Sequence, residues 1–208
     1  MKVLYFDVET TGVDVNHYHI TQLSGIIEID GVVKEEFNFF LRPPKGAVID
    51  PEALTVTGKT LQEVTSYPDR YLAYRDFTDM LSKYVEKYKK GKTAQDKFYP
   101  CAYNGYFDLQ FLNKLFLEFD DHYLGTWQNW QLIDPLPVVR MLSFSGNFLF
   151  DNHKLSTVCQ IFGISIDAHD ALSDIRATRD LTKVITGLLN SFNHQYDRNG
   201  RILYGDKN

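Results

Sequence analysis

Two carboxylate residues, Asp7 and Glu9, lie in an otherwise apolar segment near the start of the chain. The nearly continuous apolar run predicts a strand over about residues 2–8 that is covered on both faces. Because side chains two residues apart point to the same face of a strand, Asp7 and Glu9 should lie side by side. Two buried carboxylates repel each other and need a positive partner. Hard oxygen ligands favour a divalent cation such as Mg²⁺ or Mn²⁺.

A simpler explanation is that the two acids mark a polar strand exit, closed by a turn at Thr10-Thr11-Gly12. Short motifs of this kind also occur by chance. The choice between a metal site and a strand exit therefore depends on whether the rest of the chain supplies partners.

Length and charge limit the classes of function. The 208 residues suit one domain with a sizeable core. With 22 Lys and Arg against 27 Asp and Glu, the net charge is −5, unlike that of proteins that coat nucleic acid. An enzyme that holds a few nucleotides through bound metals is still allowed. Cys101 and Cys159 sit among apolar neighbours and are expected to be buried thiols without a disulfide.

The chain shows no sign of a membrane segment or a secretory signal. No apolar run approaches the ~18 residues that span a bilayer. Asp7 interrupts the first apolar run too early for a signal peptide. We therefore expect a soluble, cytoplasmic protein without a membrane partner.

The pattern of apolar residues predicts a mixed sheet flanked by helices, an α/β fold. Asp30-Gly31 between two β-rich runs is a strong hairpin signal, because both turn positions need positive φ. We expect strands near residues 2–8, 21–29, 32–41, 98–103 and 132–133, and helices near 77–88, 108–119, 154–162 and 170–190, with a helical piece after Pro137. Residues 50–75 are expected to be irregular, with at most a short helix. One domain over 1–192 would be followed by a polar tail over 193–208.

Two later carboxylates are candidate partners for the first pair. Asp108 lies where a short strand gives way to a helix, a place where Asp also commonly caps helices. Asp174 is expected to point toward the core, because it shares a helical stripe with Thr178, Leu181 and Ile185. Asp170 could provide the cap of that helix instead. A carboxylate on an apolar stripe needs a partner, and a metal shared with the first pair would supply one.

His169, five residues before Asp174, is a candidate proton acceptor. A lone loop histidine is more often merely solvated. Beside a carboxylate cluster and a metal, however, its pKa near neutrality would suit it to take a proton from water.

Three motifs in order resemble those of the DEDDh 3′→5′ exonucleases, a family of the ribonuclease H-like superfamily that includes proofreading subunits of bacterial DNA polymerases. They are Asp7-x-Glu9-Thr10-Thr11-Gly12, Asn104-x-x-Phe107-Asp108-x-x-Phe111-Leu112 and His169-x-Ala171-x-x-Asp174. The resemblance spans residues 4 to about 185. It implies a ribonuclease H-like fold with a five-stranded mixed sheet flanked by helices.

The resemblance also implies a site and its cofactors. Two Mg²⁺ or Mn²⁺ ions would be held by Asp7, Glu9, Asp108 and Asp174, with Asp7 bridging both ions and His169 acting as the base. By the same analogy, the terminal nucleotide would contact Thr10, Val56, Asn104 and Phe107. The segment Val56-Thr57-Gly58-Lys59 and Tyr103 depart from the usual family pattern at the substrate wall.

The expected function is metal-dependent 3′→5′ removal of 5′-mononucleotides from DNA ends, by two-metal phosphodiester hydrolysis. The expected partner is the 3′ end of a single-stranded nucleic acid, DNA in the first place, while a preference for single or double strands stays open. Two alternatives stay open. One is an exoribonuclease that trims RNA or short oligoribonucleotides, since no residue could be assigned to reading a 2′-hydroxyl. The other is a noncatalytic nucleic-acid-binding or polymerase-tethering module on the same fold. The short segment after the last helix favours a free-standing enzyme, although residues 195–208 could dock to a polymerase or repair partner.

Overall fold

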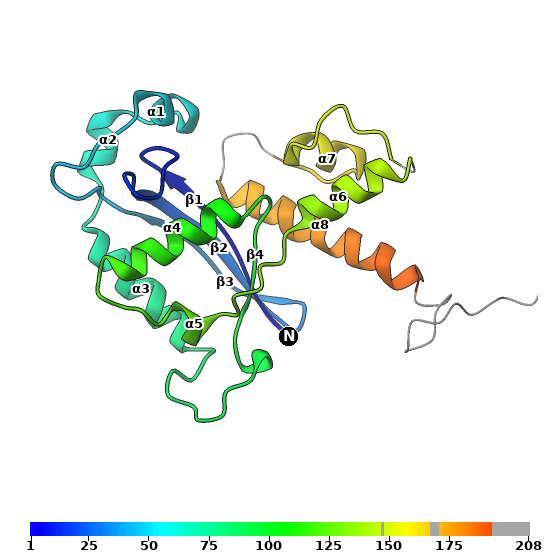
Figure 1. Cartoon of the computed structure of the whole chain (residues 1–208), viewed down its shortest axis with the longest axis horizontal. Helices are drawn as coiled ribbons and strands as arrows, with labels where there is room; N and C mark the ends of the chain where they lie inside the picture. The colour runs from blue at the N-terminus through cyan, green and yellow to red at the C-terminus, as the bar shows by residue number, and fades with distance from the viewer. Residues whose placement is uncertain (147, 167–170, 193–208) are drawn as a thin grey trace, which may run out of the picture.

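A four-stranded mixed sheet forms the centre of the computed structural model, which describes residues 1–146, 148–166 and 171–192 (Figure 1). The strands are β1 (Lys2–Thr10), β2 (Ile20–Ile29), β3 (Val32–Phe40) and β4 (Tyr99–Cys101). Their order in the sheet is β3-β2-β1-β4. β1 pairs antiparallel with β2 and parallel with the much shorter β4. The predicted α/β class and mixed sheet are confirmed.

The predicted hairpin joins β2 and β3. Asp30 and Gly31 both have positive φ, 49° and 81°, and Ile29 pairs directly with Val32 across the turn. Gly adopts positive φ freely and Asp tolerates it, so these two residues fix the two-residue turn and the register of the strands.

The predicted fifth strand near residues 132–133 is not formed in the described part of the chain. Ile133 makes only an isolated parallel bridge with Cys101. The reason is local: Asp134 caps the next helix by accepting the backbone N–H of Leu136, and Pro135 has no N–H to donate. The extended segment ends before a ladder can grow.

Helices surround the sheet (Figure 1). They are α1 (Pro51–Thr57), α2 (Leu61–Ser66), α3 (Arg70–Ser82), α4 (Tyr106–Leu117), α5 (Leu124–Trp127), α6 (Pro135–Phe144), α7 (Leu155–Ile161) and α8 (Ala171–Phe192), with a 3₁₀ turn at Ala94–Asp96. Residues 50–75, where at most a short helix is expected, contain α1, α2 and the start of α3. Asp50, Thr60 and Asp69 each accept a backbone N–H in the first turn of a helix, so three successive caps start α1, α2 and α3.

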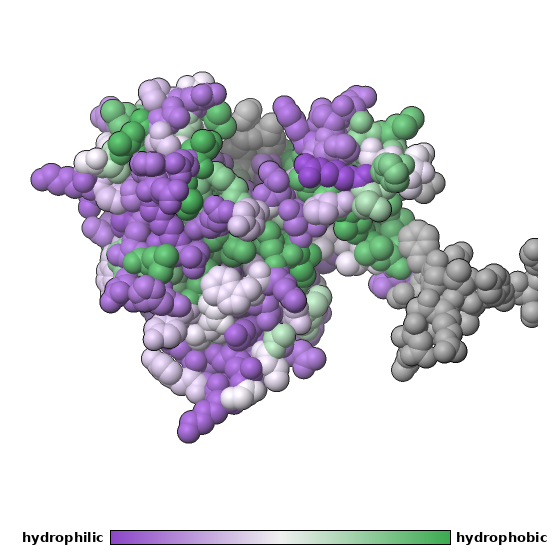
Figure 2. Space-filling model, viewed as in Figure 1, coloured by the Kyte–Doolittle hydropathy of each residue, from purple (hydrophilic) through white to green (hydrophobic). Residues whose placement is uncertain are grey.

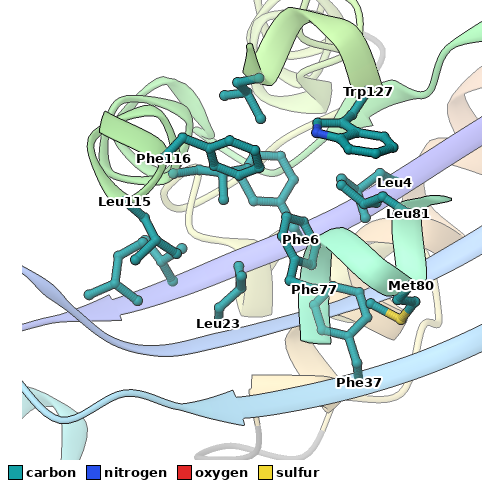
Figure 3. Close-up of a cluster of buried hydrophobic side chains, with 14 of the residues drawn as sticks. Leu4, Phe6, Leu23, Phe37, Phe77, Met80, Leu81, Leu115, Phe116 and Trp127 are labelled. Carbon is teal, nitrogen blue, oxygen red and sulfur yellow. The ribbon is translucent and has the colours of Figure 1, made fainter. Parts of the chain in front are cut away.

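The two faces of β1 bury different residues. Leu4, Phe6 and Val8 face the main core, which they share with α3 and α4. Figure 3 shows this core, where Phe77 and Phe116 close on Phe6. Burying each such side chain stabilises the fold by about 1.5–3 kcal/mol. The odd-numbered residues face the other side of the sheet, which α8 covers.

Other predictions are resolved less fully. Cys101 and Cys159 are free and buried, as expected. In the part of the chain that is described, every helix is too short or too polar to cross a membrane. The predicted tail over 193–208 lies outside the described residues, and the proposed domain boundary stays a prediction.

Candidate active site

The candidate site lies at the carboxyl end of β1. Val3 and Tyr5 pack against α8, and alternation along the strand continues this face to Asp7 and Glu9. Both carboxylate side chains are partly buried. They share one face of the strand, as the sequence pattern predicts.

Asp108 reaches this strand because β4 is short. β4 pairs with β1 only as far as Tyr5, so the edge of β1 continues beyond its neighbour. There the backbone N–H of Val8 donates to Oδ1 of Asp108 at 3.0 Å. The N-cap position of α4 is Gly105, and Asp108 lies three residues later, 5% exposed. Its carboxylate therefore serves β1 in addition to its own helix, which a simple capping role does not explain.

Asp174 lies in the first turn of α8, above a buried stripe. Thr178, Leu181 and Ile185 of this stripe are buried, as predicted. Asp174 itself is exposed, which corrects the expectation that it points into the core. The stripe reaches the open edge of the sheet at this turn, so the first member of the stripe faces the site and solvent.

The pKa values show that the four acids share one electrostatic environment. Burial, followed by the charges of Asp108, Glu9 and Asp174, raises the pKa of Asp7 well above its usual range. Burial and the charges of Asp108 and Asp174 raise the pKa of Glu9 to about 7, and the charge of Lys59 opposes the rise. Burial raises the pKa of Asp108 to about 6, against the effect of its backbone hydrogen bonds. Among the described residues, burial and like charges therefore outweigh the positive charge of Lys59 in setting the pKa of Glu9.

The chemistry of these side chains suits a hard divalent cation. All four are carboxylates, the ligand type that Mg²⁺ and Mn²⁺ prefer, and a cation would offset the repulsion that raises their pKa values. Their oxygens are not already gathered as ligands, because no three His, Cys, Asp or Glu side chains form a metal-binding group among the described residues. The acids are thus close enough to interact but not drawn together at coordination distances.

A pocket of about 320 Å³ opens beside the acids. Glu9 lines it together with three of the four predicted nucleotide contacts, Thr10, Val56 and Phe107. Val56 comes from α1, which is fastened to β1 by the hydrogen bond from the backbone N–H of Asp50 to the carbonyl of Thr11, 2.8 Å. The structure therefore brings side chains from two motifs and from the helix α1 to one cavity.

The fourth predicted contact, Asn104, lines a different pocket of about 520 Å³. Its φ of 56° is left-handed, and its backbone N–H donates to Oδ1 of Asp134 at 2.9 Å. Arg140 and Lys154 line the same pocket and are absent from the predicted site. They lie far from the motifs in sequence, and an isolated Arg or Lys carries no pattern that could have indicated them.

His169 cannot be placed, because it lies outside the described residues, as does Asp170. The proposed role of His169 therefore stays a prediction from the sequence.

The model of the RNase_T exonuclease family matches residues 4–182. This match covers most of the chain, and the chain belongs to the RNase_T exonuclease family. It is a DEDD-family exonuclease, that is, a phosphodiester hydrolase. The predicted family is confirmed.

Relatives with this domain are DNA polymerases. The chain is 29% identical to the PolC-type DNA polymerase III of Bacillus subtilis (strain 168) over 179 residues, which is 83% of the chain and 10% of that protein. The corresponding enzyme of Halalkalibacterium halodurans is 27% identical over 184 residues, 86% of the chain and 11% of that protein. The chain thus spans about a tenth of the length of these relatives.

Solved structures of Escherichia coli Exonuclease I share the fold. The complex with a dT13 oligonucleotide has a TM-score of 0.73 at 20% identity, and covers 93% of this chain and 44% of Exonuclease I. The complex with a dA16 oligonucleotide has a TM-score of 0.71 at 19% identity, over 96% of this chain and 44% of the other. The chain therefore has the ribonuclease H-like exonuclease fold, built here on a four-stranded sheet.

Proposed function

We propose that this chain is a metal-dependent 3′→5′ exonuclease that removes 5′-mononucleotides from the 3′ end of single-stranded DNA. Family membership supplies the reaction class, phosphodiester hydrolysis. The direction, the substrate and the residues that act are the parts proposed here.

One observation carries the proposal. Asp108 accepts the backbone N–H of Val8, the residue between Asp7 and Glu9. Two motifs a hundred residues apart are thereby joined at one strand edge, and the charge of Asp174 adds to the same cluster. The charges of Asp108 and Asp174 raise the pKa values of both Asp7 and Glu9, an arrangement that a purely structural polar exit would not need.

The roles of the side chains follow from their chemistry. Asp7, Glu9, Asp108 and Asp174 would hold two Mg²⁺ or Mn²⁺ ions. When bound, such a pair of cations stabilises the attacking and leaving oxygens of an in-line phosphoryl displacement. His169 is assigned, from the sequence alone, to take a proton from the attacking water.

The proposed reaction is the hydrolysis of the terminal phosphodiester bond by one water molecule. The water oxygen forms a bond to the terminal phosphorus, and the bond from phosphorus to the 3′ oxygen of the preceding nucleotide breaks. The 3′ oxygen leaves with a proton, so the products are a 5′-mononucleotide and a strand with a new 3′-hydroxyl. The pocket lined by Thr10, Val56 and Phe107 is the proposed place for the terminal nucleotide, beside the carboxylate of Glu9.

Single-stranded DNA is the proposed substrate because of the solved relatives. Exonuclease I of E. coli has the same fold and was crystallised with dT13 and dA16 oligonucleotides. Thr10, Val56 and Phe107 present one hydroxyl and two apolar side chains, which suit a sugar and a base face better than a second strand.

The test is a strand-shortening assay. The chain is incubated with 5′-labelled single-stranded DNA, duplex DNA and RNA, in Mg²⁺ or in EDTA. We expect a ladder that shortens from the 3′ end, fastest on single-stranded DNA, and none in EDTA. Internal cutting, shortening from the 5′ end or activity in EDTA would contradict the proposal. Faster shortening of RNA would show that the substrate is wrong.

A matched pair of variants on α8 isolates the site. Asp174→Asn should remove activity, whereas Asp180→Asn, two turns of sequence further along the same helix, should keep it. Asp180 is an exposed carboxylate that pairs with Arg179 at 3.1 Å. Equal activity of the two variants would remove Asp174 from the proposed site.

A further inference from the structure

A basic surface lies at the end of β1 opposite to the acids. It surrounds a cavity of about 390 Å³, and we call it the lysine–tryptophan surface. Its main members are Lys87, Lys89, Lys92, Lys97, Tyr123 and Trp130. No carboxylate is among the described residues that line the cavity. In a chain with a net charge of −5, four lysines line one cavity, and Asp96 beside the cavity forms an ion pair with one of them, Lys89.

The fold presents this charge at one end of the molecule. The segment after α3 loops around α5 at the lower end in Figure 1, and the same end is largely hydrophilic in Figure 2. Nζ of Lys92 donates to the carbonyls of Lys87 and Thr126, and Nζ of Lys97 donates to the carbonyl of Gly125 at 2.6 Å. These bonds fix the loop to α5 and hold the ammonium groups in place. Burial, followed by the charge of Lys97, lowers the pKa of Lys92, as expected where cations are crowded.

Trp130 supplies an aromatic face to the same surface. One face of its ring lies over Gly125, where a Cβ would meet Nε1 of Trp130 at 2.8 Å. The side chain is nevertheless 61% exposed, and Tyr123 beside it is 64% exposed. A ring held on one side and open on the other is a stacking platform, and cations next to it suit phosphates.

A continuous segment of the chain and further positively charged residues lie between the lysine–tryptophan surface and the candidate site. Residues 128–134 run from this surface along β4, through the bridges of Gln128 and Ile133, to Asp134 beside Asn104. Arg140 and Lys154 continue the positive charge at that end. Lys2, at the start of β1, donates to the carbonyl of Asp96, which lies in the same loop as the lysines of the lysine–tryptophan surface. This surface and the acids are therefore separated by the length of β1. Eight residue steps of a strand span about 26 Å, roughly eight stacked nucleotides at about 3.4 Å each.

We propose that the lysine–tryptophan surface binds single-stranded nucleic acid on the 5′ side of the 3′ end that is held at the acids. The inference rests on the proposed function and extends it: strands long enough to reach both places bind more tightly than short ones. Lys87 neutralises a phosphate, Lys89 does so by exchanging its ion pair with Asp96 for a phosphate, and Trp130 stacks on a base.

The experiment compares strand lengths. Binding of 5′-labelled oligothymidylates of 4 and 20 nucleotides is measured by fluorescence anisotropy in EDTA, with the strands checked for intact length. The variants are Lys87→Gln/Lys89→Gln and Trp130→Ala. For the 20-mer we expect each variant to weaken binding roughly tenfold, within the range known for base stacking and phosphate contacts. The slope of log affinity against log salt should fall by about 1.4 in the double lysine variant. Both variants should bind the 4-mer as tightly as the unaltered chain does, and in Mg²⁺ they should shorten it at the same rate.

Controls separate this surface from general effects of charge and folding. Lys34→Gln/Lys183→Gln removes the same charge from β3 and α8 and should change the affinity for the 20-mer less than twofold. Trp130→Phe keeps a stacking ring and should retain most of the affinity. Thermal melting shows whether each variant is folded.

Two results would overturn the inference. One is unaltered affinity for the 20-mer in both test variants. The other is loss of binding to an octaglutamate peptide without loss of binding to DNA, which would make the surface a docking site for an acidic protein. Failure of the proposed function would look different, as absence of Mg²⁺-dependent shortening even of the 4-mer.

Discussion

The carboxylate of Glu118 at the end of α4 and the acids at the end of β1 show opposite shifts of pKa. At the end of α4, Glu118 contacts Nδ1 of His19 at 2.6 Å and forms an ion pair, without hydrogen-bond geometry, with Nη2 of Arg70 at 2.5 Å. Although burial raises it, these partners hold the pKa of Glu118 below its usual value. At the end of β1, burial and like charges raise the pKa of Asp7. The protein's own cationic side chains stabilise the charge of Glu118, whereas the acids at the end of β1 favour the binding of an external cation.

The contrast teaches how to separate a structural acid from a functional one. Glu118 links α3, α4 and the start of β2, because its partners come from those elements. At the site, the pKa of Glu9 is raised although the described cation Lys59 acts to lower it. A buried acid with internal partners supports the fold, and a buried group of acids without them is a candidate ion site.

The largest expected effect is on catalysis. Asp7→Asn should reduce strand shortening on the order of a thousandfold or more, because the charge stabilisation lost with a metal ligand is several kcal/mol. In EDTA the same variant should be at least as stable as the unaltered chain, since one repelling charge is gone. Gel assays of activity and urea unfolding measure the two effects. A variant that is inactive because it is unfolded would break the comparison.

The second effect is on stability, with the opposite pattern. Glu118→Gln leaves Arg70 buried without its negative partner and should lower the free energy of unfolding by about 3 kcal/mol. Below the unfolding transition, its activity should stay within a few-fold of normal. Urea unfolding at constant pH measures the loss. If Glu118→Gln stopped activity while unfolding normally, the division into structural and functional acids would be wrong.

Part of the candidate site could be predicted from the sequence, and part could not. Asp7 and Glu9 could be placed on one face because strand alternation is local. That Asp108 reaches the N–H of Val8 depends on where β4 stops pairing, which no pattern in residues 99–101 indicates.

Contacts between residues far apart in the sequence could not be predicted for the same reason. His19, Arg70 and Glu118 meet only through the tertiary fold, so their ion pairs could not be predicted. The prediction of a fifth strand at residues 132–133 was wrong because Asp134 and Pro135 start a helix directly after this apolar pair. The helices α1 and α2 contain so few buried residues that no apolar stripe in the sequence indicated them.

A third prediction concerns cations. At a Mg²⁺ concentration a hundred times the dissociation constant, the folded chain should gain about 2.7 kcal/mol. For a chain of this size the melting temperature should rise by about 5–10 °C. Asp7→Asn should show almost none of this rise, whereas Asp180→Asn should show all of it. Differential scanning calorimetry makes the comparison, and an equal rise in both variants would exclude Asp7 as a ligand.

The smallest effect is on the pH dependence of stability in EDTA. Glu9 has a pKa of about 7 in the folded chain against 4.5 for an ordinary Glu, so between these pH values the folded state holds a proton that the unfolded state has lost. Stability should therefore fall as the pH rises through this window, by about 1–2 kcal/mol after screening by solvent. Glu118 acts in the opposite sense: its contribution is lost as the pH falls through its lowered pKa. Urea unfolding from pH 4 to 8 measures the slope. Glu9→Gln should flatten it, and a slope unchanged in that variant would assign the effect to other groups.

The most direct test of the account is to count bound Mn²⁺ by electron paramagnetic resonance. The unaltered chain should bind two ions, and Asp7→Asn should lose this binding while its urea unfolding stays cooperative. If Asp7→Asn bound Mn²⁺ as well as the unaltered chain, the acids at the end of β1 would not be the metal site.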